Sequence, residues 1–162
     1  GDVYKRQIMH ATKEFSSISE LKHIREQKSR LSEREAELVS PILTNLECIP
    51  YIYELFKNIV RTMNIPLREE IIQRKEFLFI VLFLFVPSVL AGGRIPNGVR
   101  KALEHVFPKV KPCTISNNIA DVFFLYQQYK YFRSDIEIIY KEMLKRLEND
   151  DVSNGLKRFI IK

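Results

Sequence analysis

The sequence is poor in several residue types that mark specialised classes of protein. Tryptophan is absent, and the 162 residues include 2 cysteines, 5 glycines and 7 prolines. This low glycine and proline content excludes collagen-like and linker-like chains. Two cysteines, Cys48 and Cys113, are too few for the disulfide framework of a small secreted protein. We therefore expect a buried free thiol at Cys48, which lies among apolar residues, and a reducing, cytoplasmic environment.

Sequence motifs of catalysis and metal binding are also missing. The chain contains no phosphate-binding glycine loop, no H-E-x-x-H zinc motif and no G-x-S-x-G nucleophile motif. The three histidines are far apart, and none pairs with a cysteine at zinc-finger spacing. The sequence thus predicts a protein that is not an enzyme, without a metal, a cofactor or an evident small-molecule substrate.

What is present is the composition of one globular domain. Hydrophobic residues make up 46% of the chain and charged residues 28%, which excludes wholesale disorder. The length suits a single domain. Because the chain starts with Gly1 and not with Met, we interpret residues 1–16 as a disordered or artefactual arm. We predict a single helical domain over 17–150 and a flexible basic tail over 151–162.

Hydrophobic periodicity predicts helices along nearly the whole chain. Apolar residues from Ile52 to Met63 recur on one face of a 3.6-residue period. Capping-box patterns of the form S-x-x-E predict helix starts near Ser17, Ser32 and Ser134. Other helices are expected over about 67–90, 99–107 and 115–132, with Thr114 as a cap. The predicted fold class is all-α, a compact bundle of five to seven helices around a central apolar helix.

The central helix is predicted from an unbroken apolar run over residues 77–86. A β-strand is disfavoured because no second strand is evident to pair with it. Insertion in a membrane through 77–91 is disfavoured too, since this segment has 15 residues and Pro87 interrupts it, whereas a bilayer requires about 20. We therefore interpret the run as part of a helix over 67–90 that other helices surround.

Positive charge is concentrated in one stretch of the sequence. The net charge is +6, a mild excess that suits an anionic partner. Residues 94–111 contain five cations and the single acid Glu104, a local charge of +4. The cations are Arg94, Arg100, Lys101, Lys109 and Lys111. The segment that follows is rich in small hydroxyl and amide side chains.

This arrangement resembles a helix-turn-helix unit over residues 97–132, although the predicted turn, Pro108 to Cys113, is longer than usual and contains no glycine. In that family a short helix supports a second helix, whose first residues enter the major groove of DNA. The resemblance implies that the cations hold phosphates and that the polar start of the second helix reads bases. The implied base-facing residues are Thr114, Ser116, Asn117 and Asn118.

The sequence alone is compatible with several functions. The leading hypothesis is a small nucleic-acid-binding protein that acts on duplex DNA. The whole chain also looks similar to small proteins of phages and mobile elements, which implies a regulator or accessory factor. The alternative is a non-catalytic interaction or structural subunit, in which the helix over 115–132 is only a packing element. Leu21, Ile24, Leu31 and Leu38 then form an apolar seam for a partner or a second copy. A small membrane protein is the third reading.

Overall fold

The computed structural model describes residues 2–9 and 14–154, and it divides into two units. The first unit is Gly1–Leu38 and the second is Val39–Lys162. The single domain predicted over 17–150 includes residues of both units. The predicted basic tail falls outside the described residues from 155 onward, while residues 151–154 belong to the last helix.

In its described residues, the first unit contains the helices α1 (Asp2–Met9) and α2 (Ser16–Val39), the last residue of α2 belonging to the second unit. Helix α1 occupies part of the segment over 1–16 that we predicted to be a disordered or artefactual arm. Helix α2 is continuous where the sequence predicted two helices, so the second capping box, at Ser32, lies inside it. A serine within a helix can turn its hydroxyl to water, and the local pattern therefore does not force a break. Pro41 follows the end of α2, as expected for a residue that cannot continue a helix.

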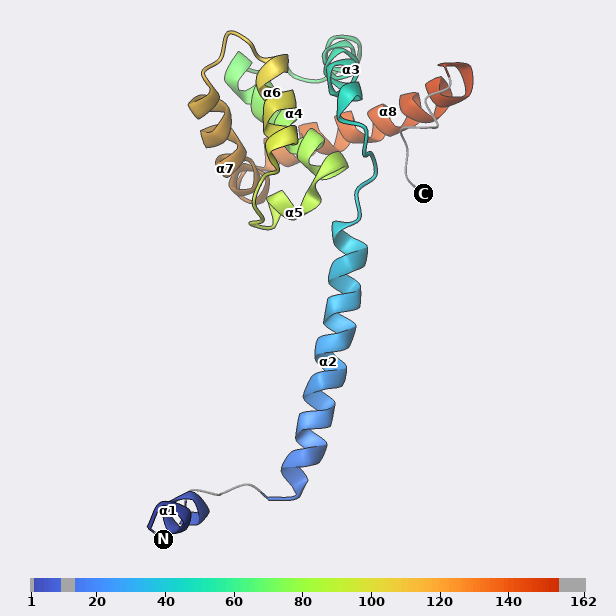
Figure 1. The fold of residues 1–162 in the computed structure, drawn as a ribbon. Coiled ribbons are helices and arrows are strands. Elements are labelled where there is room, and N and C mark those ends of the chain that lie inside the picture. The colour runs from blue at the N-terminus through green and yellow to red at the C-terminus, as the bar shows by residue number, and fades with distance from the viewer. Residues whose placement is uncertain (1, 10–13, 155–162) are drawn as a thin grey trace. The chain divides into compact units, whose positions relative to one another are not determined.

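The second unit is all-α in its described residues and confirms the predicted fold class (Figure 1). A short 3₁₀ turn, Leu46–Cys48, precedes six α-helices. These are α3 (Ile49–Thr62), α4 (Glu70–Phe85), α5 (Pro87–Leu90), α6 (Asn97–Val106), α7 (Pro112–Gln128) and α8 (Lys130–Asn154). The 3₁₀ turn forms because Asn45 Oδ1 accepts a hydrogen bond from the Glu47 amide at 3.0 Å.

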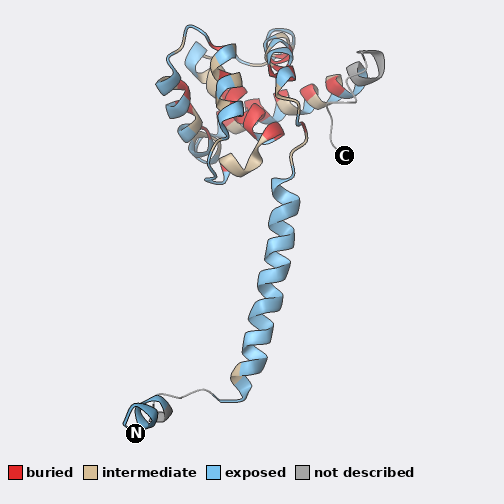
Figure 2. Ribbon diagram, viewed as in Figure 1, coloured by how far each residue is buried: buried red, intermediate tan, exposed pale blue. Residues whose placement is uncertain are grey.

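Helix α4 is the central apolar helix that the sequence predicted. It contacts α3, α5, α7 and α8, and its residues from Glu76 to Phe85 are buried except for Phe83 (Figure 2). The run over 77–86 is therefore neither a strand nor a surface segment. No helix within the described part of the chain has both the length and the apolarity that are needed to cross a membrane.

Proline and glycine set the end of this helix more sharply than predicted. The expected helix over 67–90 is divided at Val86, because Pro87 starts the separate short helix α5. Gly92 has a φ of +97°, in the left-handed region that favours glycine. A Cβ on Gly93 would lie 2.7 Å from the Ser88 carbonyl oxygen. These two glycines follow the end of α5, close to the end that the sequence predicted for a helix over 67–90.

The boundary between α7 and α8 corrects another prediction. The sequence suggested one helix over 115–132 and a new one from Ser134, but α7 ends at Gln128 and Tyr129 is extended. The Arg133 guanidinium donates a hydrogen bond to the Tyr126 carbonyl at 3.1 Å. This bond satisfies a backbone group that the end of α7 leaves without a partner. A side chain four residues into the next helix thus stabilises the break.

Candidate nucleic-acid interface

Helix α7 has one buried face and one exposed face, and the exposed face is polar or small in its first turns. Ile115, Asn118 and Val122 are buried, and α7 packs mainly against α4. Cys113, Ser116, Asn117 and Ala120 are exposed. No acidic residue lies in the first turn, where the helix dipole favours negative charge on a ligand.

Asn118 does not belong to this exposed face, and its predicted contact with DNA is wrong. Its side chain is 4% exposed, and its Oδ1 accepts a hydrogen bond from Arg74 Nε at 2.8 Å. The sequence contained the signal for this placement. Asn118 lies three residues after Ile115 and four before Val122, on the core face of the same helix.

Two basic residues of α4 fasten α7 in this orientation. Arg74 binds Asn118, and Lys75 Nζ lies 3.4 Å from Asp121 Oδ2. The Lys75 side chain is 14% exposed and its charge is paired with that of Asp121. Local sequence patterns do not predict these two contacts, because the paired residues of α4 and α7 are more than 40 positions apart. Their effect is to turn Ser116 and Asn117 outward.

The link between α6 and α7 carries two of the predicted phosphate contacts. Lys109 and Lys111 are exposed, whereas Phe107 in the same link is buried. The Phe107 ring packs edge-on against Tyr53 at 5.1 Å and Phe77 at 5.8 Å between centroids. This anchor fixes the link to α3 and α4, so both lysines stand next to the start of α7.

The remaining predicted residues occupy varied positions. Lys101 is exposed on α6, but Arg100 is half-buried and donates a hydrogen bond to Asn97 Oδ1 at 3.3 Å. Thr114 is half-buried and does not cap α7, since the cap residue is Lys111 and the helix begins at Pro112. Thr114 therefore lies inside the first turn and not before it.

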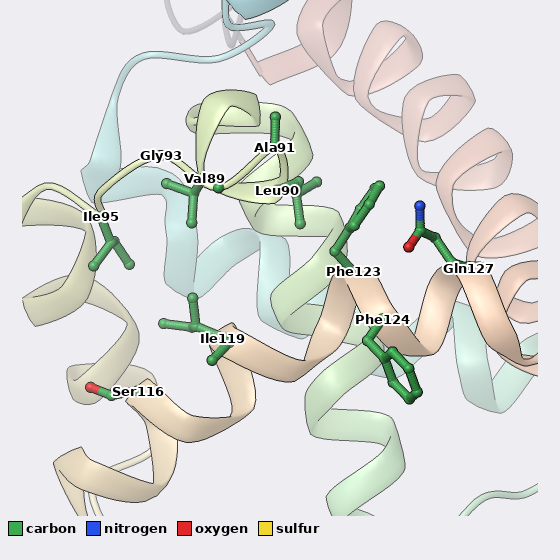
Figure 3. A pocket seen from close by; sticks show the side chains of 12 residues that line it. Val89, Leu90, Ala91, Gly93, Ile95, Ser116, Ile119, Phe123, Phe124 and Gln127 are labelled. Carbon is green, nitrogen blue, oxygen red and sulfur yellow. The ribbon is translucent and has the colours of Figure 1, made fainter.

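An open groove of about 600 Å³ lies between the segment around Gly93 and the exposed side of α7. Gly93 and Ile95 line one side of the groove, and Ser116 and Phe123 line the other. Figure 3 shows Ser116 near the start of α7 at one end of the groove. Arg94, a predicted phosphate contact, is exposed and lies in the chain between Gly93 and Ile95, although it does not itself line the groove.

The far end of the groove is more apolar. Phe123 points toward Leu90 of α5, whereas Phe124 points away from it (Figure 3). The two side chains are 37% and 56% exposed. The exposed face of α7 thus changes from small and polar at its start to aromatic toward its end.

A buried cluster of charged groups lies outside this interface and was not predicted. The Arg68 guanidinium binds Asp135 through Nε–Oδ2 at 2.8 Å and Nη2–Oδ1 at 3.3 Å. The same guanidinium lies over the Tyr131 ring, 4.7 Å from its centroid. Glu76 is 1% exposed and Asp135 3%. The cluster joins α4 and the segment that precedes it to α8.

Glu76 is the uncharged member of this cluster. Burial raises the pKa of Glu76 to about 9, and a hydrogen bond with Asp135 and the negative charge of Asp135 act in the same direction. Two neighbouring carboxyl groups cannot both ionise at low cost in a buried site. Glu76 is therefore protonated at neutral pH. The Arg68 charge is compensated by Asp135, which leaves the cluster without an evident reactive group.

Other chemistry-bearing residues do not gather into a site. Cys48 is buried, and burial raises the pKa of its thiol to about 11. Among the described residues, no three His, Cys, Asp or Glu side chains are grouped so that they could hold a metal ion. Comparison with protein-family models, curated proteins and solved structures finds no match to the chain.

Proposed function

We propose that the protein binds duplex DNA, with the start of α7 in the major groove and the α6–α7 link on the phosphate backbone. A short helix, a link and a second helix with an exposed polar start form the arrangement used by helix-turn-helix proteins. The link over residues 107–111 is longer than the usual turn. Its aromatic anchor supplies the rigidity that a shorter turn would otherwise provide.

One observation carries the proposal. Two exposed lysines lie immediately before a helix whose first exposed residues are small or neutral and polar. Small side chains permit close approach of a helix to base edges, and an asparagine can form two hydrogen bonds with adenine. Asn117 is the one predicted base-reading amide that is exposed. The role in a phage or mobile element stays a prediction from the sequence.

The test is binding of the full chain to fluorescein-labelled duplex DNA, measured by anisotropy across a salt series. The double variant Lys109→Ala/Lys111→Ala should bind more weakly to every sequence. The slope of log affinity against log salt should become less steep by roughly two units, because each phosphate contact contributes about 0.9. Lys141→Ala/Lys145→Ala removes the same charge from exposed positions on α8 and should change the slope little. Absence of binding at low salt refutes the proposal.

Base reading by Asn117 is tested separately. A preferred duplex is first selected from a randomised pool, and its affinity is compared with that for an unrelated duplex. Asn117→Ala should reduce this preference about tenfold or more, since one bidentate base contact contributes about 1–3 kcal/mol. It should leave binding to the unrelated duplex almost unchanged. An equal loss for both duplexes would assign Asn117 to the backbone.

A second candidate function, a non-catalytic interaction subunit, is favoured by α2. This 24-residue helix has no buried residue and exposes large apolar side chains. A helix of such composition gains stability when an apolar face is covered. The measurement is the mass of the full chain in solution, alone and over a range of concentrations.

A further inference from the structure

The large apolar side chains of α2 lie on one stripe of the helix or directly beside it. The large ones are between 40% and 69% exposed; they are Ile18, Leu21, Ile24, Leu31, Leu38 and Val39. Leu21 and Ile24 are three positions apart, and Ile24, Leu31 and Leu38 follow at intervals of seven. Such spacing keeps side chains on the same side of a helix that pairs with another helix.

The stripe has two edges of different composition. One edge carries Ile24, Leu31 and Leu38, and all three are apolar. The other edge, three residues before each of these, carries Leu21, Lys28 and Glu35. In a coiled coil both edges face the partner helix. The charged residues of the second edge therefore decide which partner and which orientation are acceptable.

Parallel pairing of two α2 helices would oppose like charges. Equivalent positions face each other in a parallel pair, so Lys28 would meet Lys28 of the second copy and Glu35 would meet Glu35. Antiparallel pairing removes this conflict, because each residue of one edge meets the other edge of the second copy. Lys28 then faces Leu31, and Glu35 faces Ile24. Lys28 and Glu35 of the two copies lie about 6 Å apart along the axis.

The same alignment covers the rest of the apolar stripe. Leu21 faces Leu38 of the second copy, so the two ends of the pair are apolar on both sides. Ile18 and Val39 lie beside the stripe on the same flank and meet each other at these ends. The six exposed apolar side chains of α2 thus all have a place in one antiparallel arrangement. This self-complementarity points to a second copy of the chain as the partner.

We propose that α2 is a self-association surface, which pairs antiparallel with α2 of a second copy. The inference specifies the partner for the second candidate function, the interaction subunit, and does not depend on binding of DNA. Light scattering and sedimentation of the full chain should show a mass that rises with concentration from one copy to two. A chain that stays monomeric at every concentration overturns the proposal, whatever its affinity for DNA.

A matched pair of variants tests the surface. Leu31→Lys places a charge against Lys28 of the second copy and should give a monomer. Ala36→Lys adds the same charge on the outer face of α2 and should keep the dimer. Because both positions are exposed, the melting midpoint of the compact unit should be unchanged in dilute samples of each. A dimer that persists in Leu31→Lys overturns the proposed surface.

Disulfide formation tests the orientation. Leu21→Cys and Leu38→Cys are prepared separately with Cys113→Ser, because Cys113 is exposed. Cys48 can remain, since it is buried and its pKa is raised to about 11. On oxidation, an antiparallel pair should link the two variants only when they are mixed. Linkage within each variant alone, at these positions, overturns the antiparallel arrangement.

Charge exchange gives an independent check. Lys28→Glu places like charges near each other in the antiparallel pair, next to Glu35 of the second copy, and should weaken association several-fold. Lys28→Glu/Glu35→Lys restores opposite charges and should recover the original affinity. In a parallel pair, the double variant would still oppose like charges and would bring no recovery relative to the single variant.

Discussion

Helices α2 and α4 differ in how much of their apolar surface the rest of the chain covers. Helix α4 is apolar on all sides from Phe77 onward, and four other helices cover it. Helix α2 is longer, yet it has no buried residue. Burial of apolar area supplies most of the stability of helices in proteins, and intrinsic helix propensity supplies little. The comparison indicates that α4 holds the second unit together, whereas α2 is available to a partner.

The largest expected difference is the cost of removing one apolar side chain from each helix. Phe77→Ala should lower the free energy of unfolding of the compact unit by about 3–5 kcal/mol, because it leaves a cavity beside Tyr53 and Phe107. Leu31→Ala in α2 should change it by less than about 0.5 kcal/mol in dilute solution. Urea denaturation followed by circular dichroism measures both values. Similar losses would contradict the contrast between the helices.

The polar end of α4 should make stability depend on pH. Glu76 has a pKa of about 9 in the folded protein, against 4.5 as its ordinary value. Between these values the folded state holds a proton that the unfolded state has lost. Stability should therefore fall as pH rises, by up to about 1.4 kcal/mol per unit between pH 6 and pH 8. Glu76→Gln should abolish this slope, as measured by urea denaturation at each pH.

A control for this prediction is Glu137→Gln on the exposed side of α8. Its slope against pH should equal that of the unchanged protein. A Glu76→Gln variant that keeps the full slope would show that a group other than Glu76 binds the proton.

The adjacent residues Asn117 and Asn118 allow the same comparison between an exposed and a buried side chain within one helix. Asn118→Ala should cost about 1–3 kcal/mol of stability, because it leaves the Arg74 guanidinium without its 2.8 Å acceptor. Asn117→Ala should cost less than about 0.5 kcal/mol, since Asn117 is exposed. Thermal denaturation of the two variants compares them directly. Equal effects would contradict the assignment of one residue to the core and the other to the surface.

The smallest effect is expected for the surface ion pair of α2. Arg34 and Glu37 lie 3.0 Å apart, with side chains 64% and 67% exposed. Exposed pairs contribute about 0–1 kcal/mol, and this one lies outside the compact unit. Arg34→Ala should therefore leave the unfolding of that unit unchanged. A measurable loss of its stability would show that α2 supports the compact unit after all.

Local features of the sequence predicted the class of fold correctly. The run over 77–86 was placed as a buried helix, because its only alternatives needed a second strand or a longer apolar segment. The predicted end of the helix over 67–90 coincides with the end of α5, which Gly92 and Gly93 follow. Boundaries set by contacts between distant residues were missed, as at Tyr129, where a side chain of the next helix satisfies the end of α7.

Some of the residues that the sequence predicts to contact DNA are exposed, and others are not. Lys101, Lys109, Lys111, Ser116 and Asn117 are exposed as the resemblance to helix-turn-helix units requires. The prediction that Asn118 faces DNA rests on its polarity, whereas its position between Ile115 and Val122 places it on the buried face of α7. Arg100, a predicted phosphate contact, is half-buried and bonded to Asn97.

The sequence by itself determined which segments are helical and which of them has to be buried. These properties follow from the spacing of apolar residues and from the fixed backbone needs of proline and glycine. Only the tertiary structure decided which polar groups remain available. Arg74 and Lys75 contact residues of α7, and Glu76 of α4 contacts Asp135 of α8. Such pairings join residues dozens of positions apart, where periodicity carries no information.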